Sequence, residues 1–439
     1  MNRVIRTAIA YALLPSLSLQ ASGQTTQTVT PELSPAQTAR STNSQTMDVL
    51  TLEGATEQFL QRNISLEAAR LEINIAEAER IGARFRPRPG LTVSAENLRV
   101  SGETPFNRLY EAGATIAQPL ELGNRQGIRR EVADRTVAVA EAQLTNVLRQ
   151  RLFELKRAYY DAMLARAVLL IEQENQTNFT ELVRFNTVRL NEGYIAEGEL
   201  LKVRLEQIKF NSGVANAALR VRQANVRLLE LLGVGDYGRA ARLEVAGRMV
   251  FRSTSLDLAA LRQAALANRA EVKVAEAQSS LTESVFRLER SRAKGEITPF
   301  VGYTRVGVDN TARVGVTVPL PFGNRNQGGI ARAEAEQGVA AANLRLARNR
   351  ALAEVEATYQ AYETAREQVQ AYETGILRQA DESRDITLAA YREGATELIA
   401  LLDAQRTRSE IRANYYRALF DYQTSIFQLE LATGTEFKP

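Results

Sequence analysis

Hydrophobic positions recur with helical spacing along most of the chain. Residues 124–190 contain no proline and only one glycine, Gly127, which predicts a single helix about 100 Å long. Its apolar positions lie alternately four and three residues apart, as in a coiled-coil seam: Leu148, Leu152, Leu155, Tyr159 and Ala162. Composition and the spacing of Leu, Ile and Ala also predict helices at 50–85 and 256–294.

Four short segments alternate between apolar and polar residues with a period of two, which predicts strands. These segments are 91–96, 111–116, 298–306 and 313–318. The alternation is clearest in the last one, where Val314, Val316 and Val318 alternate with Arg, Gly and Thr. With its flanks, each segment can reach the roughly 9–11 residues that a tilted strand needs to cross a bilayer.

The chain divides into two similar halves. QPLELGNR at 118–125 recurs as VPLPFGNR at 318–325, and Asn191-Glu192-Gly193 is matched by Arg392-Glu393-Gly394. Each half is predicted to contain a helix, two strands, a long helix and a return helix. The predicted divisions are a first repeat at 48–233, an inter-repeat loop at 234–255, a second repeat at 256–434 and a tail at 435–439.

A break follows each predicted strand pair. Pro119 and Pro319 mark the two junctions between strand and helix, and Asn124 and Asn324 are the predicted N-caps of the long helices. In each half, two shorter predicted helices together hold nearly as many residues as the long segment. In the first half, 65–85 and 197–232 are compared with 124–190, and in the second, 270–294 and 396–433 are compared with 324–392. Each short pair can therefore pack end to end alongside one long helix.

The first 23 residues are predicted to be a secretory signal peptide. MNRVIR is positively charged, residues 7–19 are apolar, and small residues precede a cut after Gly23 or Ala21. An N-terminal membrane anchor is the alternative, although the apolar run is short for that purpose. Residues 24–47 are polar and are predicted to be a disordered leader. The chain has no cysteine, so we expect no lipoprotein anchor.

Composition argues against catalysis. With no His and no Cys, the chain has no Ser-His-Asp triad, Cys nucleophile or usual zinc site. Carboxylates, Lys and Tyr could still act as general acids or bases, so composition disfavours enzyme activity without excluding it. We predict neither an enzyme nor a cofactor. The formal charge of +4 is spread along the helices, which gives no support for nucleic-acid binding. Residues 233–238 match the nucleotide-binding pattern GxGxxG, but they follow a predicted helix and not a strand. We therefore predict a loop there and no nucleotide site.

Four alternating strands suit a wall between lipid and water, but they cannot close by themselves. No other segment approaches 18 apolar residues, so embedding in a membrane would require a β-barrel. The smallest membrane barrels need about eight strands. Two copies would supply eight strands and three would supply twelve, and the strands alone leave that choice open.

Across residues 48–434 the chain resembles the TolC-type outer-membrane factor family. The runs at 314–336 and 116–129 make it most similar to the CzcC-like branch for cobalt, zinc and cadmium efflux. The resemblance implies a mainly α fold with a small membrane β-barrel portion, formed by a homotrimer with a 12-stranded barrel and a long periplasmic α-helical barrel. It also implies an outer-membrane location, a periplasmic adaptor and an inner-membrane RND pump.

The same resemblance assigns roles to the turns at the ends of the long helices. Gly193 and Gly394 match the glycine-centred tips where adaptor hairpins dock. The family closes its tip with inward carboxylates and a tyrosine network, and Tyr391 and Asp403 match such positions. Glu199 stands where the first-half tip carries an aspartate, and Glu197 and Glu397 add acidic charge near this gate. Ala400 replaces a ring aspartate and Thr396 replaces an arginine of the closing network, so the sequence departs from the family's closing network at these two positions.

The function that these residues imply is a passive efflux duct for heavy-metal cations. The same duct could instead serve organic compounds, drugs or type I secretion. A periplasmic coiled-coil scaffold without a pore is a more distant alternative. The carboxylates near the tips would attract cations in a trimer, or they could form an ordinary solvated acidic helix end.

Overall fold

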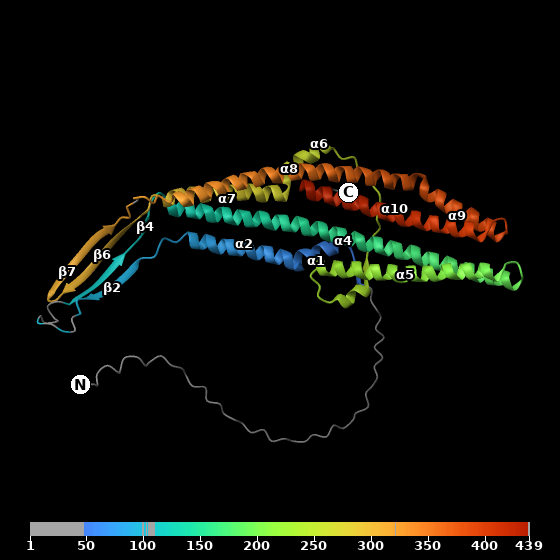
Figure 1. Cartoon of the computed structure of the whole chain (residues 1–439), viewed down its shortest axis with the longest axis horizontal. Coiled ribbons are helices and arrows are strands. Elements are labelled where there is room, and N and C mark those ends of the chain that lie inside the picture. Colours follow the sequence, from blue (N-terminus) through green and yellow to red (C-terminus); the bar gives the residue numbers. More distant parts are fainter. Residues whose placement is uncertain (1–47, 99–100, 102, 104–109, 321, 438–439) are drawn as a thin grey trace, which may run out of the picture. The chain divides into compact units, whose positions relative to one another are not determined.

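The computed structural model describes residues 48–98, 101, 103, 110–320 and 322–437. The predicted signal peptide (1–23) and leader (24–47) lie outside the described residues. The described part of the chain is mainly helical, and its elements are labelled in Figure 1. None of the described helices is both long enough and apolar enough to cross a membrane.

The first half begins with β1 (Asp48–Leu50), α1 (Leu52–Arg62) and α2 (Ile64–Ala83). Three strands follow, β2 (Gly90–Glu96), β3 (Glu111–Ala117) and β4 (Leu120–Glu121). The chain then forms α4 (Arg125–Asn191) and α5 (Glu197–Leu231). The helix predicted at 124–190 is therefore confirmed as α4.

The connection to the second half contains a 3₁₀ helix, η1 (Tyr237–Ala241), and β5 (Leu243–Val245). The second half then contains α6 (Leu258–Asn268), α7 (Ala270–Arg292), β6 (Glu296–Val306) and β7 (Asp309–Thr317). It ends with α8 (Gln327–Ala371), α9 (Leu377–Arg392) and α10 (Leu398–Thr433). The segment 324–392 is not one regular helix, because a π-helical turn, η2 (Tyr372–Ile376), separates α8 from α9.

Two helix predictions need correction at single residues. The segments 50–85 and 256–294 are each divided, at Asn63 and Arg269, where the backbone is extended. The Asn63 side chain accepts a hydrogen bond from the Leu66 N–H at 3.2 Å and so caps a new helix. The predicted N-cap Asn324 is also wrong, because α8 is preceded by Asn326. Asn324 instead accepts a hydrogen bond from the Asn326 N–H at 3.0 Å.

The strands form one antiparallel sheet in the order β2–β3–β6–β7, and β4 pairs with the start of β6. One row crosses all four strands, with Leu91 opposite Ile116, Ile116 opposite Val301 and Val301 opposite Val314. All four side chains are exposed, and Val314 is 87% exposed. Neighbouring residues such as Thr92 point to the opposite face. The sheet therefore has one apolar and one polar face, as the alternation predicted.

Helices of each half pack along one long helix. α2 and α5 contact α4, and α7 and α10 contact α8, as Figure 1 shows. α4 also contacts α7 and α10, which joins the two halves. Phe59 and Leu155 belong to the apolar cluster of the first half, and Val355 and Leu419 belong to that of the second. The end-to-end packing predicted from segment lengths is observed.

The segment 234–255, predicted to be a loop, is more ordered than a loop because side chains bind its backbone. β5 pairs in parallel with β1. The Tyr159 hydroxyl shares its one hydrogen between the carbonyls of Ala246 at 2.6 Å and Leu50 at 3.0 Å. The Tyr422 hydroxyl donates to the Arg252 carbonyl at 2.5 Å. Burial raises the pKa of Tyr159 to about 12, so this hydroxyl remains a donor at neutral pH.

Candidate functional site

Two glycine turns join α4 to α5 and α9 to α10. Gly193 and Gly394 both have φ of +79°, a conformation that glycine adopts without strain. The N–H of Tyr194 donates to the Arg189 carbonyl at 2.8 Å, which closes the end of α4. A Cβ added at either glycine would have no atom within 4 Å. The need for glycine is therefore set by backbone conformation and not by crowding.

A buried tyrosine ties α9 to α4 beside these turns. The Tyr391 hydroxyl donates to Asn186 Oδ1 at 2.5 Å, and Asn186 Nδ2 donates to the Leu182 carbonyl at 2.9 Å. The Arg189 guanidinium lies over the Tyr391 ring, 5.5 Å from its centroid. Burial raises the pKa of Tyr391, and the negative charge of Glu199 adds to the rise. The hydroxyl therefore remains protonated and neutral at physiological pH.

The predicted gate carboxylates do not all join this network. Glu199 is half-buried and close enough to act on Tyr391. Glu197 and Glu397 are exposed at the starts of α5 and α10, and Asp403 is exposed on α10. Within the described ranges, none of these three side chains makes a hydrogen bond or an ion pair. Of the four carboxylates, Glu199 is the half-buried one whose charge acts on the pKa of Tyr391, and the other three lie on the surface.

A buried polar layer that sequence analysis missed lies further along the same helices. Arg408 on α10 donates to Asp381 of α9 at 2.6 Å and to Glu174 of α4 at 2.9 Å. Burial acts to raise the pKa of Glu174, but the hydrogen bonds and positive charges of Arg408 and Arg412 lower this pKa overall. Gln405 donates to Asn175 at 3.0 Å. The layer fixes α9 and α10 to α4.

A cavity of about 180 Å³ lies between this layer and the glycine turns. Residues of α4, α9 and α10 line it: Asn178, Phe179, Glu181, Leu182, Phe185, Arg384, Leu388, Arg392, Leu401 and Gln405. Asn178 Nδ2 and Arg384 Nε are buried and have no hydrogen-bond partner in the described part of the chain. Unpaired buried donors are costly, and these two atoms are unsatisfied polar groups beside the cavity.

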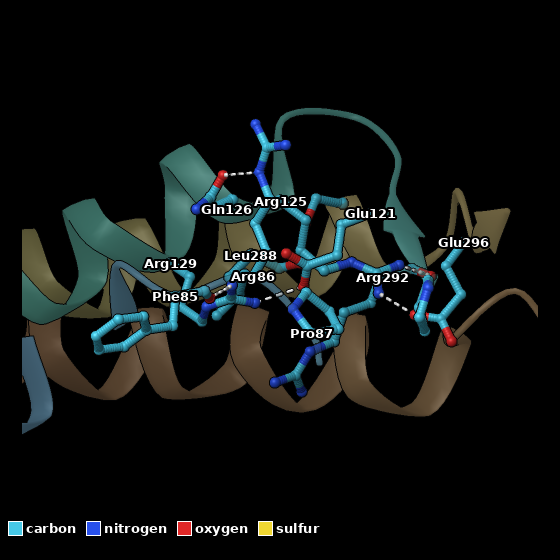
Figure 2. A network of polar contacts seen from close by, with 12 residues as sticks. Phe85, Arg86, Pro87, Glu121, Arg125, Gln126, Arg129, Leu288, Arg292 and Glu296 are labelled. Carbon is cyan, nitrogen blue, oxygen red and sulfur yellow. Dashed lines mark hydrogen bonds and ion pairs between the residues drawn. The ribbon is translucent and has the colours of Figure 1, made fainter. Parts of the chain in front are cut away.

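Arginines fix the strands to the helices at the other end of α4 (Figure 2). Arg125 donates to the Gly295 carbonyl at 2.7 Å and lies 3.7 Å from a Glu296 oxygen. Arg129 pairs with Glu121 and donates to the Phe85 carbonyl at 2.9 Å. One turn of α4 therefore holds the end of α2, strand β4 and the start of β6 together.

The two predicted junction prolines lie at this end of the helices. Pro119 lies between β3 and β4, and Pro319 follows β7 with its ring against Gly295. The two junctions differ in their arginines. Arg125 is bonded as described above, whereas Arg325, its counterpart 200 positions later, is exposed and its guanidinium has no partner among the described residues.

The described residues offer surfaces for contact with other molecules. In the residues that the structure describes, no cluster of three or more Asp or Glu side chains could hold a metal ion. The notable features are an exposed apolar sheet face, a network around the glycine turns and a basic junction. Each of these can bind or position a neighbour.

The family described as outer membrane efflux protein matches residues 55–234 and again residues 255–435. The chain is 25% identical over 377 residues to the cobalt-zinc-cadmium resistance protein CzcC of Cupriavidus metallidurans, covering 84% of this chain and 86% of that protein. It is also 25% identical over 294 residues to the nickel and cobalt resistance protein CnrC of the same species, covering 66% of this chain and 68% of that protein.

Solved structures share the fold. A membrane protein from Pseudomonas aeruginosa superposes with a TM-score of 0.75 at 18% identity, covering 88% of this chain and 90% of that one. CusC, whose structures are described in terms of transmembrane channel formation, superposes with a TM-score of 0.73 at 20% identity, covering 88% of this chain and 92% of that one. The outer membrane protein VceC of Vibrio cholerae superposes with a TM-score of 0.73 at 18% identity, covering 88% of this chain and 97% of that one.

Proposed function

The chain belongs to the outer membrane efflux protein family, and from that premise we propose that three copies form a passive duct carrying heavy-metal cations out of the cell. The duct would hold twelve strands in the outer membrane and a helical barrel in the periplasm. We also assign residues 1–23 to an export signal, because a positively charged start is followed there by an apolar run and small residues. The protein would catalyse no reaction and would need no cofactor.

One observation carries the proposal: a single chain has an exposed apolar sheet face with two open edges. Leu91, Ile116, Val301 and Val314 form a continuous apolar row, and β2 and β7 have no further strand beside them in the described part of the chain. Unpaired backbone groups in hydrocarbon cost several kcal/mol each. Pairing β7 of one copy with β2 of the next would satisfy both edges, and the family resemblance supports three copies.

Exposed apolar stripes on the helices support the same assembly. α2 exposes Ile64, Leu71, Ile75 and Ile81. A groove between α7 and α8 is lined largely by apolar atoms and includes Leu281, Val285, Val339 and Ala340. Patches of this kind are typical of protein interfaces. We propose that these surfaces are covered by neighbouring copies.

The proposed cargo follows from the relatives that the chain resembles. Two are named for resistance to cobalt, zinc and cadmium or to nickel and cobalt, and a third, NccC of Alcaligenes xylosoxydans, is named for nickel, cobalt and cadmium at 26% identity. The chain has no His or Cys, so the duct would carry these ions without the soft ligands that select them. Selection would lie in an RND pump and a periplasmic adaptor.

The tips are the proposed docking site for the adaptor. Gly193 and Gly394 hold two turns in the same conformation, and the nearby cavity presents unpaired donors from Asn178 and Arg384. An adaptor hairpin that offers a carboxylate or carbonyl next to an apolar side chain would fit this cavity. Tyr391, with Asn186 and Glu199, would hold the α9 and α10 pair against α4 while the duct is closed.

Conductance and mass test the duct. Protein extracted from outer membranes should have the mass of three chains and should form ion-conducting pores in planar bilayers. A monomer that remains in water and leaves the bilayer sealed would contradict the duct and favour the scaffold without a pore.

Metal tolerance tests the cargo. A strain that lacks this chain should lose tolerance to Co²⁺, Zn²⁺ or Cd²⁺ and keep its tolerance to organic antibiotics. The reverse pattern would indicate the alternative cargo, organic compounds or drugs. A loss of polypeptide export alone would indicate type I secretion.

A further inference from the structure

The connections between strands and helices combine exposed arginines with exposed apolar side chains. Arg84 ends α2, Arg88 precedes β2, and Arg325 lies between β7 and α8. All three are exposed, and none has an ion-pair partner among the described residues. Exposed Arg86 and Arg130 lie beside them, bonded only to neutral acceptors in that part of the chain.

The acidic residues of this region are already paired with other cations. Glu121 is bound by Arg129, and Glu289 is bound by Arg292 at 2.6 Å. Glu296 lies 3.7 Å from Arg125. These pairs leave Arg84, Arg88 and Arg325 as uncompensated positive charge. The region is therefore complementary to an anion and not to another arginine-rich surface.

The neighbouring apolar residues indicate where this charge lies relative to a bilayer. The alternation of apolar residues in β7 continues past the end of the strand to Phe322. The apolar residues of this run are all exposed: Val316, Val318, Leu320 and Phe322. Phe322 is 84% exposed and Phe85, next to Arg84, is 67% exposed. Leu120 and Leu122 are the exposed counterparts after β3. Arginines beside such a belt can place their guanidinium groups at the level of lipid phosphates.

We infer that this surface, composed of Arg84, Arg88 and Arg325 with the apolar belt around Phe85 and Phe322, binds the headgroups of anionic phospholipids in the leaflet that faces the periplasm. The inference rests on the proposed membrane location of the sheet. The guanidinium groups would bind the phosphate and the added negative charge of the headgroup, while the belt contacts the acyl chains. This contact would anchor the strand end of the trimer at a fixed depth.

The test uses the purified full-length protein in a neutral detergent, with dioleoylphosphatidylglycerol and dioleoylphosphatidylcholine as probes. Lipid binding is followed by native mass spectrometry and by the rise in melting temperature. The triple variant Arg84→Gln, Arg88→Gln and Arg325→Gln should weaken phosphatidylglycerol binding on the order of tenfold to hundredfold. A matched control with three exposed arginines of α5 changed, Arg204→Gln, Arg220→Gln and Arg222→Gln, should bind it within about twofold of wild type.

Several results would overturn the inference. Equal binding of phosphatidylglycerol by the triple variant and wild type would remove the arginines from the site. Equal stabilisation by phosphatidylcholine would show that the surface makes only an apolar contact with lipid. Binding of lipopolysaccharide in place of phosphatidylglycerol would show that the ligand is not an anionic phospholipid of the leaflet that faces the periplasm. A changed reversal potential with unchanged lipid binding would assign the arginines to the water-filled path. Absence of wild-type pores, measured on the same preparation, would instead count against the proposed function.

Discussion

The two ends of α4 are held by different kinds of contact. At the strand end, Arg125 and Arg129 donate charge-assisted hydrogen bonds to backbone carbonyls and to Glu121. At the tip, α4 is held to its neighbours by a neutral hydrogen bond from Tyr391 to Asn186 and by a glycine turn. Hydrogen bonds to charged groups contribute about 1.5–3 kcal/mol, and neutral ones contribute about 1 kcal/mol. We therefore expect the tip to separate at lower cost than the junction.

The ends also differ in charge. The exposed charged side chains at the junction of strands and helices are mainly arginines, whereas Glu192, Glu197, Glu393, Glu397 and Asp403 are exposed near the turns. A duct with this arrangement would attract cations at the end where they enter and would be anchored at the end where they leave.

The largest expected effect is at the strand end, on the apolar face of the sheet. Val314→Arg places a charge opposite Val301, at the centre of β6. A charge facing lipid near the middle of a barrel wall costs about 2–4 kcal/mol, and a trimer would carry three of them. We expect the variant to be lost from outer membranes, as measured by membrane fractionation and immunoblotting.

Thr92→Arg is the matched control, because Thr92 is also exposed but lies on the polar face of β2. This variant should assemble normally. If Val314→Arg reached the outer membrane as well as Thr92→Arg, the apolar face would not be the lipid-facing one.

The second prediction concerns the glycine turns. Valine at Gly193 or Gly394 would have to adopt φ of +79°, which costs about 1–3 kcal/mol and favours a different turn. We expect export to be abolished while trimers remain intact, as measured by metal tolerance and by native gels. Gly198→Val is the control, since Gly198 lies within α5 and an added Cβ meets nothing within 4 Å. Normal export in both tip variants would remove the turns from the docking proposal.

Local signals in the sequence were sufficient to predict the strands at one end of the molecule and the long helix α4. The alternation around Val314 and the scarcity of Gly and Pro after Asn124 predicted the strands and α4, because each depends on residues close in sequence. Gly193 was assigned through the family resemblance, and glycine also suits an end-of-helix turn, which needs a residue that tolerates positive φ. The break at Asn63 had a local capping signal that the helical composition around it obscured.

Residues that act over long sequence separations were not predictable in this way. Tyr391 meets Asn186 across 205 positions, and Asn186 resembles any other polar residue on a helix. Arg125 binds a backbone carbonyl, an acceptor that every residue offers, so no sequence pattern marks the contact. Asn175 and Gln405 carry the one usable signal, because polar residues buried in a helical seam must find partners.

The third prediction tests whether the neutral contact holds the tip. Tyr391→Phe leaves the buried Asn186 Oδ1 without its donor, which should cost about 1–3 kcal/mol. We expect a lower melting temperature and a higher resting conductance than wild type. Tyr194→Phe is the control, because Tyr194 is 71% exposed. Equal melting temperatures and conductances for Tyr391→Phe and Tyr194→Phe would show that the hydroxyl contributes nothing.

The same tyrosine predicts a pH dependence. Burial raises the pKa of Tyr391 in the folded state, so its contribution to stability is fully present below the unfolded pKa of about 10 and is lost as pH rises toward the folded pKa. The melting temperature of wild type should therefore fall more steeply above about pH 10 than that of Tyr391→Phe. Parallel curves would contradict a buried neutral hydroxyl at this position.

The smallest expected effect concerns the acidic charge of the tip. Glu199→Gln together with Asp403→Asn removes two carboxylates per chain, and six in a trimer. Both are at least partly solvated, so salt would screen their field and the preference for cations should fall only about twofold at low ionic strength. The reversal potential in a KCl gradient measures this preference. Asp134→Asn with Glu410→Gln removes the same charge from exposed sites elsewhere on α4 and α10 and should leave the potential unchanged. If both pairs shifted the potential equally, selectivity would come from net charge and the acidic tip would have no separate role.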